Sequence, residues 1–346
     1  MVRERYGVEM GETQSSGVDA VVPVPAPAAS GDALHVPVLR DRILELLAPC
    51  LAKPGSVYVD GTLGLAGHAE AVLDAFPGAR LIGIDRDPMA LDLAAQRLAR
   101  FGDRVELFEA VYDELPEVLD EAGTPRVQAV LLDLGLSSLQ IDRRERGFAY
   151  SVDAPLDMRM DGKQELTAAT VINTYPRESL VRILRAYGEE RFADRIVGRI
   201  LAERERAPFE RSGRLVQVVS DAIPMAVRKT GGHPAKRTFQ ALRIEVNGEL
   251  AALEGVLPAA LDAIAVHGRL AVLAYHSLED RMVKQLFRDA TTDAAPPHLP
   301  VVPDHLRARF ALVTRGAEKP SDAETQTNPR ATSARLRCIE RMGEAA

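Results

Sequence analysis

The feature that most constrains this 346-residue chain is a glycine-bearing segment that follows a short apolar run. Residues Val57–Val59 are apolar and β-branched at both ends, which is typical of a buried parallel strand. The run ends at Asp60, and a helix is predicted from about Leu65 to Ala75. Between them and into the helix, three glycines recur at intervals of three residues: Gly61, Gly64 and Gly67. Such a loop lets a polar ligand approach backbone N–H groups at a helix N-terminus.

A second predicted strand, Arg80–Asp85, also ends in an acid. Strand, glycine loop, helix and strand form a βαβ unit, whose ligand cleft lies beyond the carboxyl ends of the strands. The three glycines alone are equally compatible with an ordinary tight turn. Asp85, however, follows Gly61 by 24 residues, close to the separation at which an acid contacts a ribose. The combination favours a nucleoside or dinucleotide site.

The spacing of the glycines distinguishes between these ligands. It is G-x-x-G-x-x-G, not the G-x-G-x-x-G of the common dinucleotide fingerprint. Asp60, directly before the loop, indicates a cationic or polar ligand in place of a pyrophosphate. S-adenosylmethionine fits better because it has no phosphate, and Asp85 can accept hydrogen bonds from both of its ribose hydroxyls. An NAD-dependent oxidoreductase remains the alternative enzyme class.

Composition limits the class of protein. With 46% hydrophobic and 27% charged residues, the chain can form a large core and an additional region. No apolar run reaches the length of a membrane span and the N-terminus lacks a signal-peptide pattern, so we predict a cytoplasmic protein with no membrane association. Cys50 and Cys338 are predicted to be unpaired core thiols rather than a disulfide. Without clustered histidines we predict no metal site.

The charge of the chain is unevenly distributed. The net charge is −7, which is unusual for a nucleic-acid-binding protein. Yet residues 182–243 carry fourteen Lys and Arg against seven Asp and Glu, and residues 303–341 carry eight against five. These two basic segments predict contacts with a polyanion. A non-catalytic RNA-binding factor is therefore a further hypothesis.

Patterning along the chain predicts an α/β fold with a mostly parallel sheet and an inserted helical region. Residues 1–34, rich in Pro and Ala, are predicted to be a disordered tail. Residues 35–141 and 246–346 are assigned to the α/β core. Residues 142–245 are assigned to the insertion, because their apolar residues follow helical spacing. Further strands are expected at 105–108, 127–134 and 268–275, with a closing antiparallel hairpin at 310–314 and 334–340. Further helices are expected at 40–51, 88–101, 114–121, 215–226 and 248–266, the last with a kink at Pro258.

Polar residues at predicted strand ends indicate the chemistry. Four of them converge at one edge of such a sheet: Asp60, Asp85, Asp133 and His276. Methyl transfer to an exocyclic amine requires alignment, which can contribute roughly 7–11 kcal/mol, and acceptors for the amine protons. We assign the amine contacts to Asp133 with Ser137 or Ser138, and His276 is a candidate proton acceptor. No metal and no covalent intermediate are required.

Several segments together resemble one known family. The chain is similar to the bacterial 16S ribosomal RNA (cytosine-N4)-methyltransferases, which use S-adenosylmethionine, over about residues 35–341. The matching segments are 35–39, 60–68, 83–87, 133–138, 146–148 with 155–161, 233–243, 275–281 and 328–337.

The resemblance implies a class I methyltransferase core with a helical domain inserted after the fourth strand. It also implies methylation of N4 of cytosine 1402 in the 16S rRNA of the small ribosomal subunit, by a monomer or homodimer. The cofactor contacts of the family map onto Ala66, Gly67, His68, Asp85, Tyr112, Asp133 and Gln140, to which the glycine loop adds Asp60 and Gly64. Phosphate contacts are expected from Lys236, Arg237, Arg243, Arg330, Arg335 and Arg337, for which solvated surface charge is the simpler interpretation.

Two positions depart from the family pattern. Ala66 stands where glycine is usual, and its methyl group is expected to be tolerated if the backbone keeps a negative φ. Tyr112 stands where phenylalanine is common and preserves a ring that could stack on adenine. A plain core tyrosine is equally compatible with the sequence.

Overall fold

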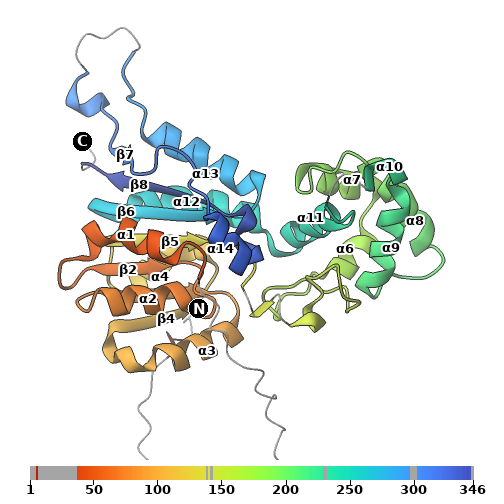
Figure 1. Ribbon diagram of the computed structural model, residues 1–346, viewed down its shortest axis with the longest axis horizontal. Helices are drawn as coiled ribbons and strands as arrows, with labels where there is room; N and C mark the ends of the chain where they lie inside the picture. Colours follow the sequence, from red (N-terminus) through yellow and green to blue (C-terminus); the bar gives the residue numbers. More distant parts are fainter. Residues whose placement is uncertain are drawn as a thin grey trace, which may run out of the picture.

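The structure is a computed structural model that describes residues 5–6, 37–137, 139–140, 143–228, 232–296 and 302–343. Figure 1 shows two parts side by side: a layered α/β part, here called the sheet part, and a helical part formed by residues 143–247. In the described ranges, every helix is too short or too polar to cross a membrane.

The sheet part is built on eight strands in the order β1-β4-β3-β2-β5-β6-β8-β7. The strands are β1 Arg5–Tyr6, β2 Val57–Asp60, β3 Arg80–Asp85, β4 Val105–Glu109, β5 Val127–Asp133, β6 Ile264–Ala274, β7 Phe310–Leu312 and β8 Arg335–Arg341. Strands β2 to β6 are parallel, whereas β8 runs antiparallel to both β6 and β7. The chain changes direction across the sheet between β2 and β5, so this is the switch point where ligands bind.

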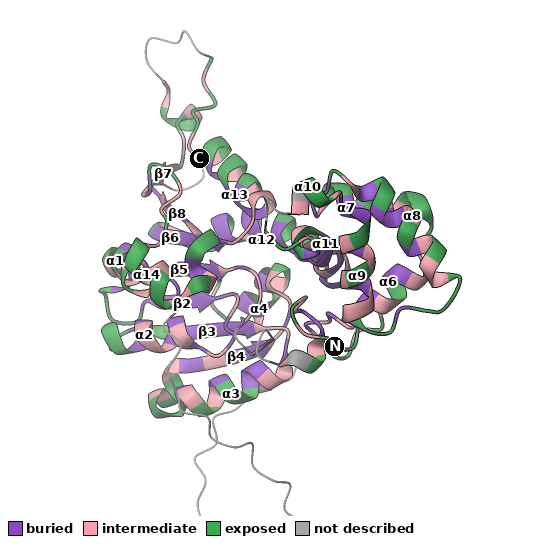
Figure 2. Ribbon diagram, turned by 45° about the vertical axis from the view of Figure 1, so that its right-hand side comes forward, coloured by how far each residue is buried: buried purple, intermediate pink, exposed green. Residues whose placement is uncertain are grey.

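Helices cover both faces of the sheet, as predicted (Figure 1). One face packs against α1 Arg40–Leu51, α2 Gly67–Ala75 and α3 Pro88–Leu98. The other packs against α4 Leu115–Glu121, α12 Glu249–Ala263 and α13 Ser277–Ala290. Along β2, Tyr58 belongs to the first hydrophobic cluster and Val59 to the second. Both side chains are fully buried, and Figure 2 shows the central strands in the buried colour. This arrangement confirms the predicted α/β fold with a mostly parallel sheet.

The helical part has a hydrophobic core of its own. Its helices are α6 Ala168–Thr174, α7 Arg177–Ala186, α8 Ala193–Arg204, α9 Ser212–Ala222, α10 Met225–Arg228 and α11 Lys236–Asn247. Leu180, Ile196 and Leu215 from three of these helices are fully buried in it. The helix predicted at 215–226 extends too far at its C-terminal end, since α9 ends at Ala222. Ile223 is extended because Pro224 follows it, and α10 begins after the break.

The return to the sheet part is abrupt. Helix α11 ends at Asn247 and α12 begins at Glu249, so Gly248 alone separates them. Its φ of 62° lies in the left-handed region that favours glycine.

Three further features differ from prediction. Strand β6 begins at Ile264, four residues earlier than expected, because an irregularity in its pairing with β5 at Val127/Ala129 extends the ladder. Strands β7 and β8 pair antiparallel but do not form a tight hairpin, since α14 Asp322–Thr327 and a short 3-10 helix, η5 Pro329–Ser333, lie between them in the chain. Strand β1, in the segment predicted to be disordered, pairs with β4.

The two cysteines are buried and unpaired, as predicted. Burial raises the pKa of both Cys50 and Cys338 to about 12, so neither is a thiolate at neutral pH.

Candidate active site at the strand ends

Three carboxylates lie at the carboxyl ends of adjacent strands. Asp60 ends β2, Asp85 ends β3 and Asp133 ends β5, with β2 paired to both neighbours. The loop after β2 joins them: the Gly64 N–H donates to Asp85 Oδ2 at 2.7 Å, and the Asp133 N–H donates to Thr62 Oγ1 at 2.6 Å. The structure therefore gathers these predicted site residues around one glycine loop.

Asp60 is almost completely buried. Its carboxylate accepts hydrogen bonds from the Tyr58 hydroxyl at 3.0 Å and the Thr62 N–H at 3.2 Å. Burial raises the pKa of Asp60 to about 6, against a smaller opposing effect of His68. A cationic ligand group nearby would lower the pKa of this carboxyl group again.

Asp85 is held from two sides. Besides the bond from Gly64, its Oδ1 accepts from the Asp87 N–H at 2.9 Å. Burial raises the pKa of Asp85 to about 6, and these two backbone bonds oppose the shift. Each carboxylate oxygen can accept a second hydrogen bond, so two neighbouring ligand hydroxyls can be bound without displacing the loop.

At two positions of the glycine loop, a side chain would collide with neighbouring residues. A Cβ on Gly61 would lie 2.6 Å from Leu132 Cδ2, and one on Gly67 would lie 2.7 Å from Pro37 Cγ. Gly64 has a φ of +52°. The condition under which the Ala66 methyl group was expected to be tolerated, a negative φ, is not met: its φ is 60°, and it is the left-handed residue immediately before α2. A family glycine there would avoid this strain.

Asp133 has a partner that sequence reasoning did not assign. The Tyr275 hydroxyl donates to Asp133 Oδ1 at 2.8 Å, and burial raises the pKa of Tyr275, which keeps it a donor. His68 Nε2 lies 3.5 Å from Asp133 Oδ2 and is buried with no hydrogen-bond partner among the described residues. Tyr275 directly follows β6, so the rule that identified the strand-end acids could also have identified it.

Ser137 and Gln140 are bound to each other. The Ser137 N–H donates to Gln140 Oε1 at 3.0 Å, and the Gln140 N–H donates to Ser137 Oγ at 3.3 Å. A Cβ on Gly64 would lie 3.5 Å from Ser137 Cβ, so this turn borders the glycine loop. Ser138 lies outside the described residues. Contacts of these residues with cofactor or substrate stay predictions.

Tyr112 lies at the start of a short 3-10 helix, η2 Tyr112–Glu114, beside the glycine loop. Its hydroxyl donates to the Glu249 carbonyl at 3.0 Å, and its ring packs against the second hydrophobic cluster. Burial raises the pKa of its hydroxyl. The ring is thus fixed in place at the edge of the site, and stacking on adenine stays a prediction.

His276 has a structural role in the ligand-free arrangement. It is the N-cap of α13, and its Nδ1 accepts from the Glu279 N–H at 3.4 Å. Its Nε2 lies 3.1 Å from Glu279 Oε1. Because the cap uses the Nδ1 lone pair, accepting a proton there would break the capping interaction. The proton-acceptor role of His276 stays a prediction that this geometry does not favour.

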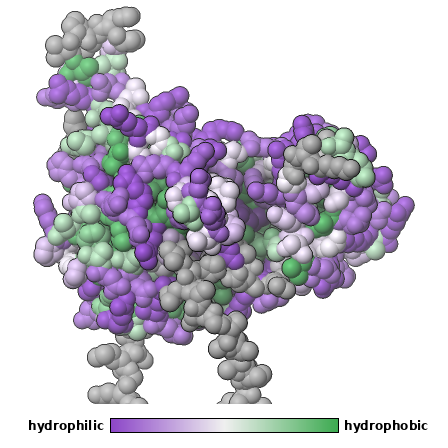
Figure 3. All heavy atoms as spheres, viewed as in Figure 1, coloured by the Kyte–Doolittle hydropathy of each residue, from purple (hydrophilic) through white to green (hydrophobic). Residues whose placement is uncertain are grey.

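The predicted phosphate contacts divide into two groups. Arg243 is 16% exposed and makes two 2.8 Å hydrogen bonds to the Glu249 carboxylate, so its charge is already paired. Arg335 and Arg337 both pair with Asp280. Lys236 and Arg237, at the start of α11, are exposed, although Arg237 donates to the Glu189 carbonyl. Arg330 lies on η5. Figure 3 shows hydrophilic residues over much of one face of both parts.

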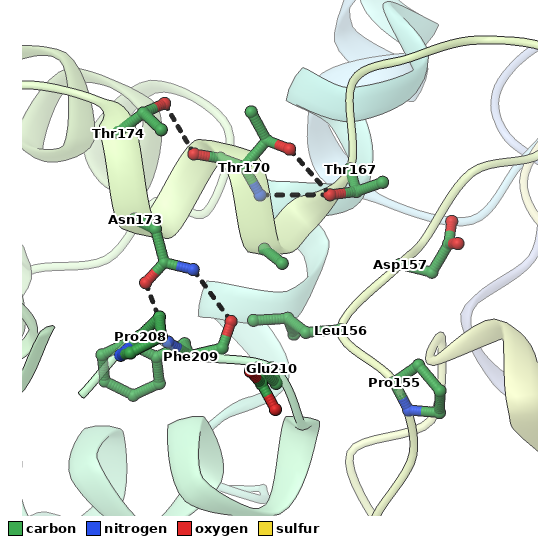
Figure 4. Close-up of a pocket in the computed structure, with 11 residues that line it drawn as sticks. Pro155, Leu156, Asp157, Thr167, Thr170, Asn173, Thr174, Pro208, Phe209 and Glu210 are labelled. Carbon is green, nitrogen blue, oxygen red and sulfur yellow. Dashed lines mark hydrogen bonds between the residues drawn. The ribbon is translucent and has the colours of Figure 1, made fainter.

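A surface pocket of about 420 Å³ lies in the helical part, away from the strand ends (Figure 4). Thr167, Thr170 and Thr174 line one side, and Phe209 lies on the other, where its backbone exchanges two hydrogen bonds with Asn173. It contains none of the strand-end residues.

Comparison with known proteins identifies the family. A family model described as the MraW methylase family matches residues 32–342. The chain belongs to the MraW methylase family. A relative from Streptomyces avermitilis, named ribosomal RNA small subunit methyltransferase H, is 60% identical over 310 residues, covering 90% of this chain and 98% of its own. A relative of the same name from Cutibacterium acnes is 60% identical over 316 residues, covering 91% and 94%.

Membership in the MraW methylase family makes the chain a methyltransferase whose cofactor is S-adenosylmethionine. The residues present fit that cofactor. Its positive charges match a site with three carboxylates, two of which have a pKa raised to about 6 by burial. Its ribose hydroxyls match the remaining acceptor positions of Asp85, and the unpartnered His68 Nε2 leaves a polar atom for a ligand. Among the described residues, no cluster of three or more His, Cys, Asp or Glu is suited to a metal ion.

Proposed function

We propose that this protein methylates N4 of cytosine 1402 in 16S rRNA, acting in the cytoplasm on the small ribosomal subunit or its RNA. The names of the relatives support an rRNA substrate in that subunit, and the resemblance of the motifs supports the base and the atom. The observation that supports this chemistry is the position of Asp133, a strand-end carboxylate that Tyr275 orients beside the glycine loop.

S-adenosylmethionine supplies a methyl group on a positively charged sulfur. Asp85 would bind the ribose of the cofactor. Asp60 and His68, which lie on either side of the glycine loop, would contact its charged groups. Tyr112 would border the adenine, and Gln140 would keep the 137–140 turn against the loop.

Asp133 would act on the acceptor amine. With Tyr275 bound to Oδ1, Oδ2 remains to accept a hydrogen bond from the exocyclic nitrogen of the base. That bond draws the nitrogen lone pair out of conjugation and gives the amine proton an acceptor. Ser137 and Ser138 are the candidate second contacts. The cytosine must leave its stack to reach this position, which costs a few kcal/mol.

The helical part would hold the RNA backbone. Lys236 and Arg237 are exposed at the start of α11, and Arg330 is carried by η5 on the sheet part. Phosphate contacts fix position and do not specify sequence, so the choice of cytosine rests on the strand-end site.

The test is mass spectrometry of small-subunit rRNA fragments before and after incubation with the protein and isotope-labelled cofactor. We expect one labelled methyl group on N4 of cytosine 1402. A label on another nucleotide would overturn the choice of substrate. Cofactor binding with no label on any RNA, naked or assembled, would overturn the proposed reaction.

A further inference from the structure

The loop between β3 and α3 contacts both ends of the helical part. At the start of the helical part, Arg146 Nη1 lies 2.5 Å from Asp87 Oδ2. At its end, the Asn247 carbonyl accepts from Arg86 Nη1 at 2.8 Å. The loop that follows Asp85 is therefore bound at both points where the chain crosses between the two parts.

Asp87 links Arg146 to the ribose-binding acid. Its side chain is 1% exposed. Asp87 is the N-cap of α3, where its Oδ1 accepts a hydrogen bond from the Met89 N–H at 3.1 Å. The backbone N–H of Asp87 donates to Asp85 Oδ1. A buried carboxylate needs a compensating cation, and Arg146, itself only 17% exposed, provides it. Displacing Arg146 would leave Asp87 buried and uncompensated next to Asp85.

The backbone of the helical part fixes the position of Arg146. The Arg146 carbonyl accepts from the Met158 N–H at 2.9 Å. Asn247, from the other end of the helical part, binds the same segment through the Met158 carbonyl and the Met160 N–H, both at 2.8 Å. Gly147 lets the two segments approach: a Cβ there would lie 2.1 Å from the Pro155 carbonyl oxygen.

We propose that Arg146 is a positioning residue that couples cofactor binding to the placement of the helical part. The inference rests on the proposed function only in that Asp85 holds the cofactor. Arg146 does not touch the cofactor in this scheme. It acts through Asp87 on the Asp85 loop. Coupling between two sites is reciprocal, so RNA bound to the helical part changes cofactor affinity, and cofactor changes RNA affinity by the same factor.

The test compares three variants of the full chain. Arg146→Gln removes the charge, and Arg146→Lys restores it. Arg269→Gln is the matched control, because Arg269 is 15% exposed, pairs with Glu340 at 2.7 Å and lies on β6 away from the loop. Calorimetry gives the Kd of S-adenosylhomocysteine with and without a small-subunit rRNA fragment. Hydrogen exchange of the ligand-free proteins follows the Gly64 and Met89 amides.

We expect Arg146→Gln to weaken S-adenosylhomocysteine binding roughly tenfold and to abolish the effect of RNA on it. Arg146→Lys should recover most of the affinity, and the Gly64 and Met89 amides should exchange faster only in Arg146→Gln. Equal Kd values and equal RNA effects in Arg146→Gln and the wild type would overturn the inference, as would a wild-type Kd that RNA leaves unchanged.

A second variant, Asp87→Asn, tests the same inference if Arg146→Gln does not fold. Asp87→Asn keeps a good helix cap and removes the charge that Arg146 compensates, so it should lose the RNA effect in the same way. An intact RNA effect in Asp87→Asn would overturn the inference. In each of these cases methylation of rRNA by the wild type still supports the proposed function, whose failure would show as cofactor binding without methylation of any RNA.

Discussion

The strand-end site and the basic surface of the helical part are held in place in different ways. At the strand ends, Asp60 is buried and Asp85 is half-buried, and both receive hydrogen bonds from the backbone of nearby loops. On the helical part, Lys236 and Arg237 are exposed on long side chains. Buried, bonded groups have one geometry, whereas exposed cations adapt to the partner they meet. The first region can align reacting atoms, and the second can only attract and orient a polyanion.

Of the substitutions that test this contrast, Asp85→Ala is expected to have the largest effect, which is on cofactor affinity. Two hydrogen bonds to a charged group, each worth about 1.5–3 kcal/mol, would be lost, so cofactor affinity should fall by roughly 100-fold or more. Calorimetric titration with S-adenosylhomocysteine measures it, with Glu106→Gln on β4 as a control at an acid outside the site. Unchanged affinity in Asp85→Ala would place the cofactor elsewhere.

Turnover separates binding from chemistry. Asp133→Ala should lower the rate of methyl transfer by about 100-fold or more because the proton acceptor is lost. Tyr275→Phe should lower it less, by roughly tenfold, because only the hydrogen bond that orients Asp133 is removed. Single-turnover rates with saturating cofactor provide the comparison. Normal turnover in Asp133→Ala would refute its catalytic role.

The pH dependence of cofactor affinity probes the buried acids. Burial raises the pKa of Asp60 and Asp85 from 3.8 to about 6, so between pH 4 and 6 these groups stay protonated in the ligand-free fold but are ionised in the unfolded chain. Their contribution to stability is therefore full below about pH 4 and is lost as the pH rises through 6. A cationic cofactor binds the ionised form. Affinity should be constant above about pH 7 and fall by up to roughly tenfold per pH unit per group below 6. Titrations across this range check it, and Asp85→Asn should flatten the profile.

The basic surface should respond to salt instead. Replacing Lys236 and Arg237 together by glutamine should weaken RNA binding and reduce the slope of log K against log salt by roughly 0.7–0.9 for each phosphate contact removed. Filter binding at several salt concentrations measures the slope. Arg206→Gln, on an exposed residue paired with Glu203, is the control. Equal slopes in the double variant and the wild type would remove these residues from the RNA interface.

The smallest effect is expected at Ala66. Its left-handed backbone costs about 1 kcal/mol, and its buried methyl group contributes about 0.8 kcal/mol, so the two nearly cancel. Ala66→Gly should change the free energy of unfolding by less than about 1 kcal/mol, measured by urea denaturation. A large loss of stability would show that packing of the methyl group outweighs the strain.

The sequence was sufficient to predict the parallel strands and the acids that end them. Parallel strands place their carboxyl ends at one edge, so Asp60, Asp85 and Asp133 could be brought together from position alone. Tyr275 was missed as the partner of Asp133 because the strand was predicted to extend to residue 275, which placed His276 at its end, whereas β6 ends at Ala274. Arg243 was assigned to phosphate because its partner, Glu249, lies beyond a helix break. Local pattern indicates which side chains are charged but not which tertiary neighbour neutralises them.

Gly248 sets the mechanical character of the connection between the two parts. A single left-handed residue joins α11 to α12, so this connection between the two parts is a short, rigid turn and not a flexible linker. Any reorientation of the helical part would change the backbone at this position as well as at the first crossing, and a residue other than glycine would be strained here.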